Sequence, residues 1–206
     1  MLHLRRQDFD DLDHLYRINL MNSCSGFKSA NLIGTKSNDG IPNVAVFSSV
    51  THLGSNPPLL GIVFRPVSDV PRNTYENIKE TGQFTVNHIH LDIIEQAHHT
   101  SAKYDKRISE FDITELEEEY KNNWHAPFVK GAPIQMALTY CEEYKIKANN
   151  TIQLIAEIKD LYIKDDIIEQ DGFINLSKAN IVAINGLDGY ALPSLKQRID
   201  YQRPKK

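Results

Sequence analysis

Arg72, Asn73 and Thr74 are the first residues of this chain whose types and order suit the binding of an anion. The run Asn-Thr-Tyr-Glu is typical of a helix start, where Asn73 acts as the cap and the amides of Thr74 and Tyr75 lack intrahelical partners. Free amides and the positive end of the helix dipole favour a phosphate, and the Arg72 guanidinium can donate to the same group. The alternative is a capped surface helix beside a solvated arginine.

A second polar group lies at the end of an apolar strand predicted at residues 41–51, where Ser48, Ser49 and Thr51 follow one another closely. Hydroxyls are poor core material, but they can hydrogen-bond to the oxygens of a ligand. The Ser-Asn-Pro-Pro turn at residues 55–58 is stiffened by its prolines. Taken alone it is ordinary turn chemistry. Together with the helix start, it predicts a phosphate-sized site beside a surface on which a flat ring can lie.

Histidines offer a competing interpretation, a metal site. His88 and His90 share one face of a predicted strand, and His98 and His99 follow in a predicted helix. Their spacing matches no standard zinc motif, so surface or interface histidines are the simpler explanation. The sequence also lacks the Gly-x-Ser-x-Gly motif of many serine hydrolases. We therefore predict no metal and no catalytic side chain. The sequence leaves open the roles of His52, His88, His90, Tyr104 and Trp124.

The composition excludes several classes of partner. The chain has 206 residues, 24% of them charged, and a net charge of −4, which gives no field to attract nucleic acid or an anionic membrane. No apolar run reaches the ~18 residues of a membrane span, and the acidic N-terminal stretch does not resemble a signal peptide. The two cysteines form no Cys-x-x-Cys pair. We expect a cytoplasmic protein.

Strands predominate among the elements that must position these residues. A hairpin is predicted around Asp39-Gly40, because positive φ costs little there. Further strands are predicted at residues 59–64, 83–87, 134–141, 152–159 and 181–184, and helices at residues 8–20, 73–81, 91–100 and 114–120. Many strands without regular strand–helix alternation favour an antiparallel barrel. We expect one mainly β domain over residues 1–206.

Four motifs, in this order, resemble the flavin reductase-like family, whose fold is the FMN-binding Greek-key split β-barrel. They are NVAVFS at residues 43–48, SNPP at 55–58, RNTYENI at 72–78 and TGQFTVN at 81–87. The resemblance is strongest over residues 30–90. It continues more weakly through SAKYDKRISEF at residues 101–111 and through the later strands to Gly189-Tyr190.

The resemblance implies a homodimer with FMN near the interface. It implies that the hydroxyl-rich segment lines the flavin ring and ribityl chain, that the turn residues contact the ribityl or phosphate end, and that Arg72 and Thr74 bind the phosphate. The implied cofactor-binding residues are Ser48, Ser49, Val50, Thr51, Ser55, Asn56, Arg72, Asn73 and Thr74. Two departures stand out: Arg72-Asn73 replaces a common Lys-Asp, and Thr51 replaces a frequent asparagine.

The activity implied by the resemblance is hydride transfer from NADH or NADPH to the flavin. The dinucleotide binds transiently, since the sequence lacks a Gly-x-Gly-x-x-Gly fingerprint. The alternative is a flavoredoxin-like carrier that keeps its FMN and passes electrons to a protein partner. A third possibility is a flavin-binding protein without turnover, and the sequence does not separate the three.

Overall fold

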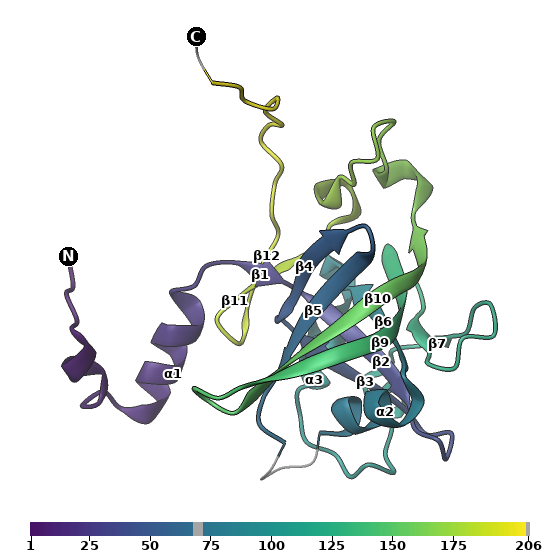
Figure 1. Cartoon of the computed structure of the whole chain (residues 1–206), viewed down its shortest axis with the longest axis horizontal. Helices are drawn as coiled ribbons and strands as arrows, with labels where there is room; N and C mark the ends of the chain where they lie inside the picture. Colours follow the sequence, from purple (N-terminus) through teal and green to yellow (C-terminus); the bar gives the residue numbers. More distant parts are fainter. Residues whose placement is uncertain (68–71, 205–206) are drawn as a thin grey trace.

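The computed structural model describes residues 1–67 and 72–204, and its centre is one seven-stranded antiparallel sheet in the order β3-β2-β6-β9-β10-β5-β4 (Figure 1). The bounds of these strands are β2 Asn31–Lys36, β3 Pro42–Phe47, β4 Val50–Ser55, β5 Pro58–Phe64, β6 Gln83–His88, β9 Ile134–Ile146 and β10 Thr151–Ile163. A small sheet joins β1 Lys28–Ser29, β11 Ala183–Asn185 and β12 Gly189–Ala191, and β7 Glu118–Glu119 pairs with β8 Phe128–Val129.

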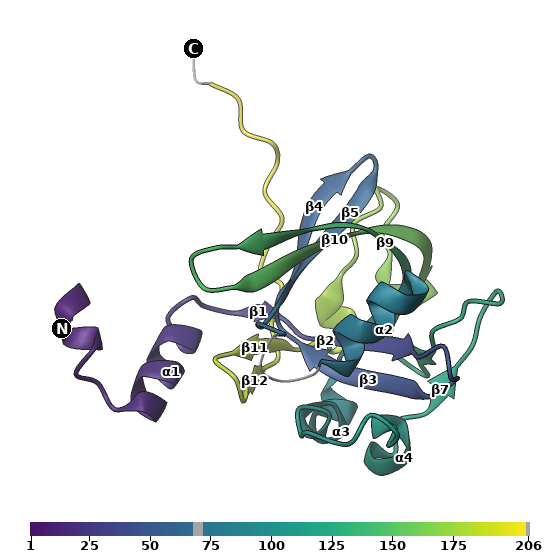
Figure 2. The same ribbon diagram turned by 60° about the horizontal axis from the view of Figure 1, so that its bottom comes forward.

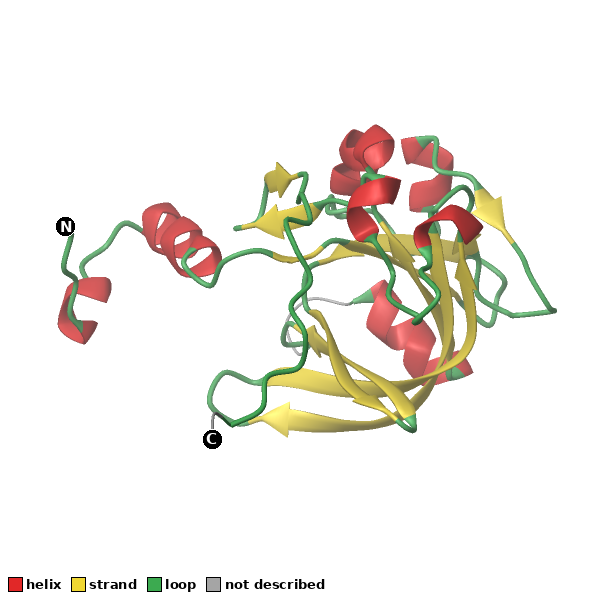
Figure 3. Ribbon diagram, turned by 90° about the horizontal axis from the view of Figure 1, so that it is seen from above, coloured by secondary structure: helices red, strands yellow, loops and turns green. Residues whose placement is uncertain are grey.

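The two edges of the large sheet are consecutive in sequence, and this closes it into a split barrel. The predicted strand over residues 41–51 is in fact two strands, β3 and β4, because Ser48 and Ser49 form a bend between them. β3 lies at one edge of the sheet and β4 at the other, so the curved sheet brings both edges to this bend (Figure 3). The predicted mainly β barrel is confirmed.

Three short helices that pack on the barrel lie on two sides of β3. α2 Asn73–Thr81 lies on one side, and α3 Ile94–His99 and α4 Glu110–Thr114 lie on the other (Figure 2). Short 3-10 helices span Arg6–Phe9, Leu91–Ile93, Asp165–Ile167 and Leu176–Ala179. α1 His14–Ser23 extends away from the barrel with the N-terminal segment and buries none of its residues. None of the helices in residues 1–67 and 72–204 has the length and apolarity needed to cross a bilayer.

Two apolar clusters follow from strand alternation. Ile33 lies in the barrel interior with Phe84 and Leu138, whereas its neighbour Leu32 faces the opposite way and packs with Phe111 of α4. Both faces of β2 are therefore buried, which holds this strand firmly in the middle of the fold.

Glycines with positive φ and capping side chains set the ends of the helices and the hairpin turn. Gly82 ends α2 with φ of 70°, and Gly40 supports the β2–β3 hairpin with φ of 86°. The predicted helix over residues 114–120 is wrong, because α4 ends at Thr114 and the chain continues into β7. The cap is Ser109, whose Oγ accepts from the Phe111 amide at 3.3 Å, and Glu115 ends the helix in a left-handed conformation.

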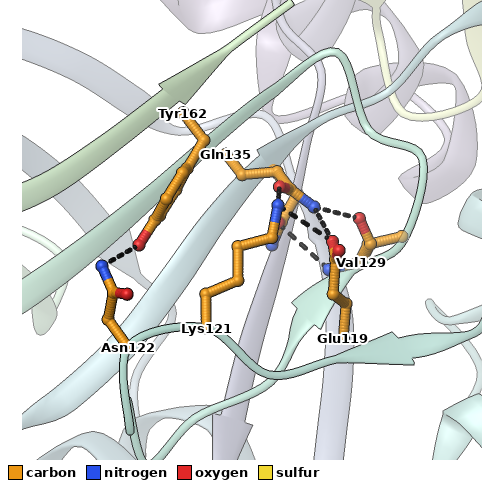
Figure 4. Close-up of polar contacts among 7 residues, drawn as sticks. Glu119, Lys121, Asn122, Val129, Gln135 and Tyr162 are labelled. Atoms are coloured by element: carbon orange, nitrogen blue, oxygen red, sulfur yellow. Dashed lines mark hydrogen bonds and ion pairs between the residues drawn. The ribbon is translucent and has the colours of Figure 1, made fainter.

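A polar cluster, which we call the Lys121 cluster, fixes the segment after β7 to the barrel (Figure 4). Lys121 Nζ donates to Gln135 Oε1 at 2.5 Å and lies 3.1 Å from Glu119 Oε2. Gln135 Nε2 donates to the Val129 carbonyl at 2.6 Å, and Lys121 also lies over the Tyr162 ring, 4.7 Å from its centroid. Each charged or amide group in the cluster thus has a partner.

Candidate functional site

A cavity of about 770 Å³ opens where the β3–β4 bend meets the start of α2. Its walls come from β3, the end of β5, the start of α2 and a loop at residues 100–106. Ligand sites in proteins commonly measure about 300–1,000 Å³. The predicted residues that line this cavity are Ser48, Ser49, Arg72, Asn73 and Thr74.

Arg72 occupies the cap position of α2, one residue earlier than the sequence predicted. Asn73 is the first helical residue, and no side chain caps this end of the helix. The first intrahelical bond runs from the Glu76 amide to the Arg72 carbonyl at 2.9 Å, so the amides before Glu76 lack acceptors within the helix. Arg72 Nε is buried, and among residues 1–67 and 72–204 no acceptor hydrogen-bonds to it. Because a guanidinium stays charged, this buried donor fits an anionic group.

Thr74 is fixed in place by a residue of β3. Asn43 Nδ2 donates to Thr74 Oγ1 at 3.1 Å, and both residues are buried. Since this bond uses a lone pair of the threonine oxygen, the Thr74 hydroxyl proton can point into the cavity. The bond also ties the start of α2 to the edge strand, which keeps the two walls of the cavity together.

The bend contributes a hydroxyl of fixed orientation. Ser49 Oγ donates to the Val63 carbonyl of β5 at 2.8 Å, which leaves its lone pairs as acceptors. Ser29 Oγ donates to the carbonyl of Val50, the first residue after the bend, at 2.9 Å. Ser48 and Ser49 therefore lie on a braced segment.

The outer edge of β3 also faces the cavity, which the sequence did not predict. The Val44 amide donates to Glu110 Oε2 at 3.2 Å instead of to β2. Because backbone groups alternate along an antiparallel strand, Val46 directs its amide and carbonyl to the same edge, and it too lines the cavity. Burial raises the pKa of Glu110, and the backbone amides that it accepts from oppose this effect.

The loop at residues 101–106 adds two lysines, Lys103 and Lys106, to the cavity wall. Tyr104 between them is held by His99, whose Nε2 lies 2.6 Å from the tyrosine oxygen, and the two rings stack. Asp105 accepts from Arg107 Nε at 3.0 Å, which holds the Asp105 pKa below its ordinary value. The weaker resemblance over residues 101–111 was the one sequence signal that pointed to this loop.

Four predicted residues do not line this cavity: Val50, Thr51, Ser55 and Asn56. β4 runs from the bend to the far turn, so at about 3.3 Å per residue Ser55 lies roughly 20 Å along the strand from Ser49. At that end Ser55 pairs with Pro58 of β5, and its Oγ lies 3.4 Å from His52 Nε2. Within one chain, the hydroxyl of Ser49 at the cavity and the hydroxyl of Ser55 at the far turn are therefore far apart, although the sequence predicted them in one site.

The histidines that suggested a metal site make separate contacts with different partners. His98 Nδ1 lies 3.3 Å from the Tyr190 oxygen, and His90 Nδ1 lies 3.5 Å from Asp92 Oδ2. Burial lowers the pKa of His88 to about 4. Within the described ranges, no three histidine, cysteine or acidic side chains group as metal ligands. Trp124 Nε1 donates to the Phe84 carbonyl at 3.2 Å, away from the cavity.

Comparison with known proteins decides the family. The family described as flavin reductase like domain matches residues 25–177, which is most of the chain. This chain belongs to the flavin reductase-like family. A crystal structure from Shewanella frigidimarina NCIMB 400, of a split-barrel protein provisionally named a flavin reductase, is 44% identical with a TM-score of 0.94. That similarity covers 98% of this chain and 100% of the other.

Two more distant structures share the fold. Nitrilotriacetate monooxygenase component B from Bacillus cereus has a TM-score of 0.84 at 17% identity, over 97% of this chain and 98% of that one. The flavoredoxin of Desulfovibrio vulgaris (Miyazaki F) has a TM-score of 0.72 at 20% identity, over 85% of this chain and 91% of that one. The split-barrel fold predicted from the sequence is thus confirmed.

Proposed function

We propose that this chain is a single-domain, cytoplasmic FMN-binding oxidoreductase of the flavin reductase type, which accepts hydride from NADH or NADPH. We further propose that it works as a homodimer with FMN near the interface. The observation that carries the proposal is the buried Arg72 Nε, which has no acceptor within the described part of the chain and belongs to a residue that lines a cavity beside a helix start. Membership of the flavin reductase-like family supports the same reading.

The phosphate of FMN would be held at the start of α2. Arg72 supplies a permanent charge, Thr74 a hydroxyl, and the amides of Asn73 and Thr74 lie at the positive end of the helix. Each charge-assisted hydrogen bond contributes about 1.5–3 kcal/mol, so a few of them suffice for firm binding. Asn43 positions Thr74 for this contact.

The ring would lie toward the bend and the outer edge of β3. Ser48 and the Val46 backbone offer donors and acceptors there, and Ser49 offers acceptors because its proton is donated to Val63. When bound, FMN supplies the chemistry of accepting hydride from a nicotinamide. The residues of this chain hold the ring flat and place polar groups at its edge, with no side chain acting as acid or base.

Val50, Thr51, Ser55 and Asn56 stay predictions for the flavin site, but not within one chain. Ser55 and Asn56 lie at the far end of β4, and Val50 and Thr51 do not line the cavity although they follow the bend. We propose that all four contribute where a second copy brings them to the cavity. The proposed flavin site is therefore completed only in the homodimer.

The absorbance spectrum of the purified protein is the first test. We expect the bands of bound flavin, and bleaching of those bands when NADH or NADPH is added without oxygen. Turnover of added free flavin then supports the reductase. Bound flavin that ignores both dinucleotides but is reduced by dithionite supports the flavoredoxin-like carrier instead. A protein that binds no FMN contradicts both.

A further inference from the structure

The cavity carries more positive charge than one phosphate ester requires. Among the residues that the structure describes, four basic side chains line it, Arg65, Arg72, Lys103 and Lys106, against two acidic ones, Asp105 and Glu110. The whole chain has a net charge of −4, so this excess is local. A cleft lined by one sign of charge concentrates the field and attracts a ligand of the opposite sign.

Both acids in the cavity wall are already engaged by other groups. Asp105 Oδ1 accepts from Arg107 twice, from Nε and from the backbone amide, each at 3.0 Å. Glu110 Oε2 accepts from the Val44 amide. Within the described residues, neither Lys103 nor Lys106 forms an ion pair with a carboxylate.

The loop that carries the two lysines is anchored between them. Tyr104 stacks on His99 with 6.1 Å between the ring centroids and 13° between the planes, and the 2.6 Å contact between them fixes the tyrosine oxygen. The Asp105–Arg107 contacts lie within the loop itself. The two lysines thus flank a tyrosine that joins the loop to the end of α3.

We propose that Lys103 and Lys106 bind the diphosphate bridge of the nicotinamide dinucleotide. This inference rests on the proposed function, in which Arg72 and the start of α2 hold the FMN phosphate. A dinucleotide brings a second polyanionic group to the same cavity, and the sequence has no Gly-x-Gly-x-x-Gly loop to receive it. Flexible, strongly hydrated lysines suit a co-substrate that must leave after each turnover.

The double variant Lys103→Gln/Lys106→Gln tests this assignment in the FMN-loaded protein. We expect KM for NADH and for NADPH to rise by about tenfold or more, because two charge-assisted contacts are lost. The Kd for FMN and the KM for 1-benzyl-1,4-dihydronicotinamide, a hydride donor without phosphate, stay unchanged. The control Lys130→Gln/Lys164→Gln removes the same charge from exposed lysines outside the cavity and leaves all four constants unchanged.

Three kinetic results overturn the assignment: an unchanged KM for both dinucleotides, an equal rise for the phosphate-free donor, or a rise confined to NADPH. The last would move the contact to the 2′-phosphate.

ADP-ribose, which has the diphosphate but no nicotinamide to donate hydride, separates this inference from the proposed function. Binding of ADP-ribose that the double variant loses supports the diphosphate site even if neither dinucleotide reduces the flavin, whereas no binding to the wild-type protein contradicts it.

Discussion

Two regions of this molecule treat a buried or half-buried cation in opposite ways. In the Lys121 cluster the ammonium lies against Glu119, Gln135 and the Tyr162 ring, so its charge is balanced by the protein (Figure 4). In the cavity, Arg72 Nε is buried and no residue of the described part accepts from it. A satisfied cation is part of the structure, whereas an unsatisfied one beside a cavity calls for a ligand.

A third nitrogen refines this comparison. His88 Nδ1 is also buried, and the described residues provide no partner for it. Burial lowers the pKa of His88 from its ordinary 6.5 to about 4, so the ring stays neutral near pH 7. A guanidinium cannot discharge itself in this way. Arg72 therefore points to an anion, and His88 does not.

The largest expected effect on stability comes from breaking the satisfied cluster. Gln135→Leu removes a buried amide that serves Lys121, Glu119 and the Val129 carbonyl, and we expect it to cost about 3 kcal/mol of unfolding free energy. Urea unfolding of the apoprotein measures this, and the Kd for FMN stays unchanged. The control Lys130→Gln breaks an exposed ion pair and leaves the free energy of unfolding nearly unchanged. If Gln135→Leu loses no more unfolding free energy than the control, the Lys121 cluster does not stabilise the fold. If it weakens FMN affinity, the cluster is not separate from the FMN site.

The next effect is a pH dependence caused by His88. The unfolded chain takes up a proton near pH 6.5, but the folded chain takes it up only near pH 4, so the unfolded state binds more protons between these values. Stability is fully present above this window and falls by about 2 kcal/mol from about pH 7.5 to about pH 5. Urea unfolding at both values, with His88→Gln for comparison, measures the difference. An identical pH slope in the variant refutes the assignment to His88.

A smaller effect is expected at the cavity wall itself. Thr74→Val keeps the shape of the side chain but leaves Asn43 Nδ2 without its acceptor, so we expect a loss of about 1 kcal/mol of stability and a rise of about fivefold in the Kd for FMN. Thr74→Ser retains the hydroxyl and should restore both quantities. Failure of Thr74→Ser to restore FMN binding would show that the hydroxyl is not the group that matters.

The predicted residues that line the cavity are those that local chemistry indicates. Arg72 and Thr74 were found because a helix start has a recognisable pattern, even though the cap proved to be Arg72 and not Asn73. Ser55 was grouped with Ser49 because its turn follows closely on the strand predicted at residues 41–51. The bend between β3 and β4 turns that continuous pattern into the two opposite edges of the sheet.

The missing parts of the site depend on tertiary packing. Glu110 reaches the edge of β3 only because α4 packs there, and no spacing in the sequence records this contact. Val46 contributes through its backbone, which any residue at that position could supply. Lys103 and Lys106 are ordinary surface types until the loop is placed beside the cavity. The motifs thus indicated the bend and the start of α2, and the fold supplied the other walls of the cavity.

Arg72→Ala gives the most direct test of an anion site at the start of α2. Titration of the apoprotein with FMN and with riboflavin, which lacks the phosphate, separates binding of the phosphate from binding of the ring. We expect the Kd for FMN to rise by about tenfold to a hundredfold and the Kd for riboflavin to stay nearly constant, while the control Arg198→Ala, outside the cavity, changes neither. Equal losses for both ligands would remove Arg72 from the phosphate site and contradict the account.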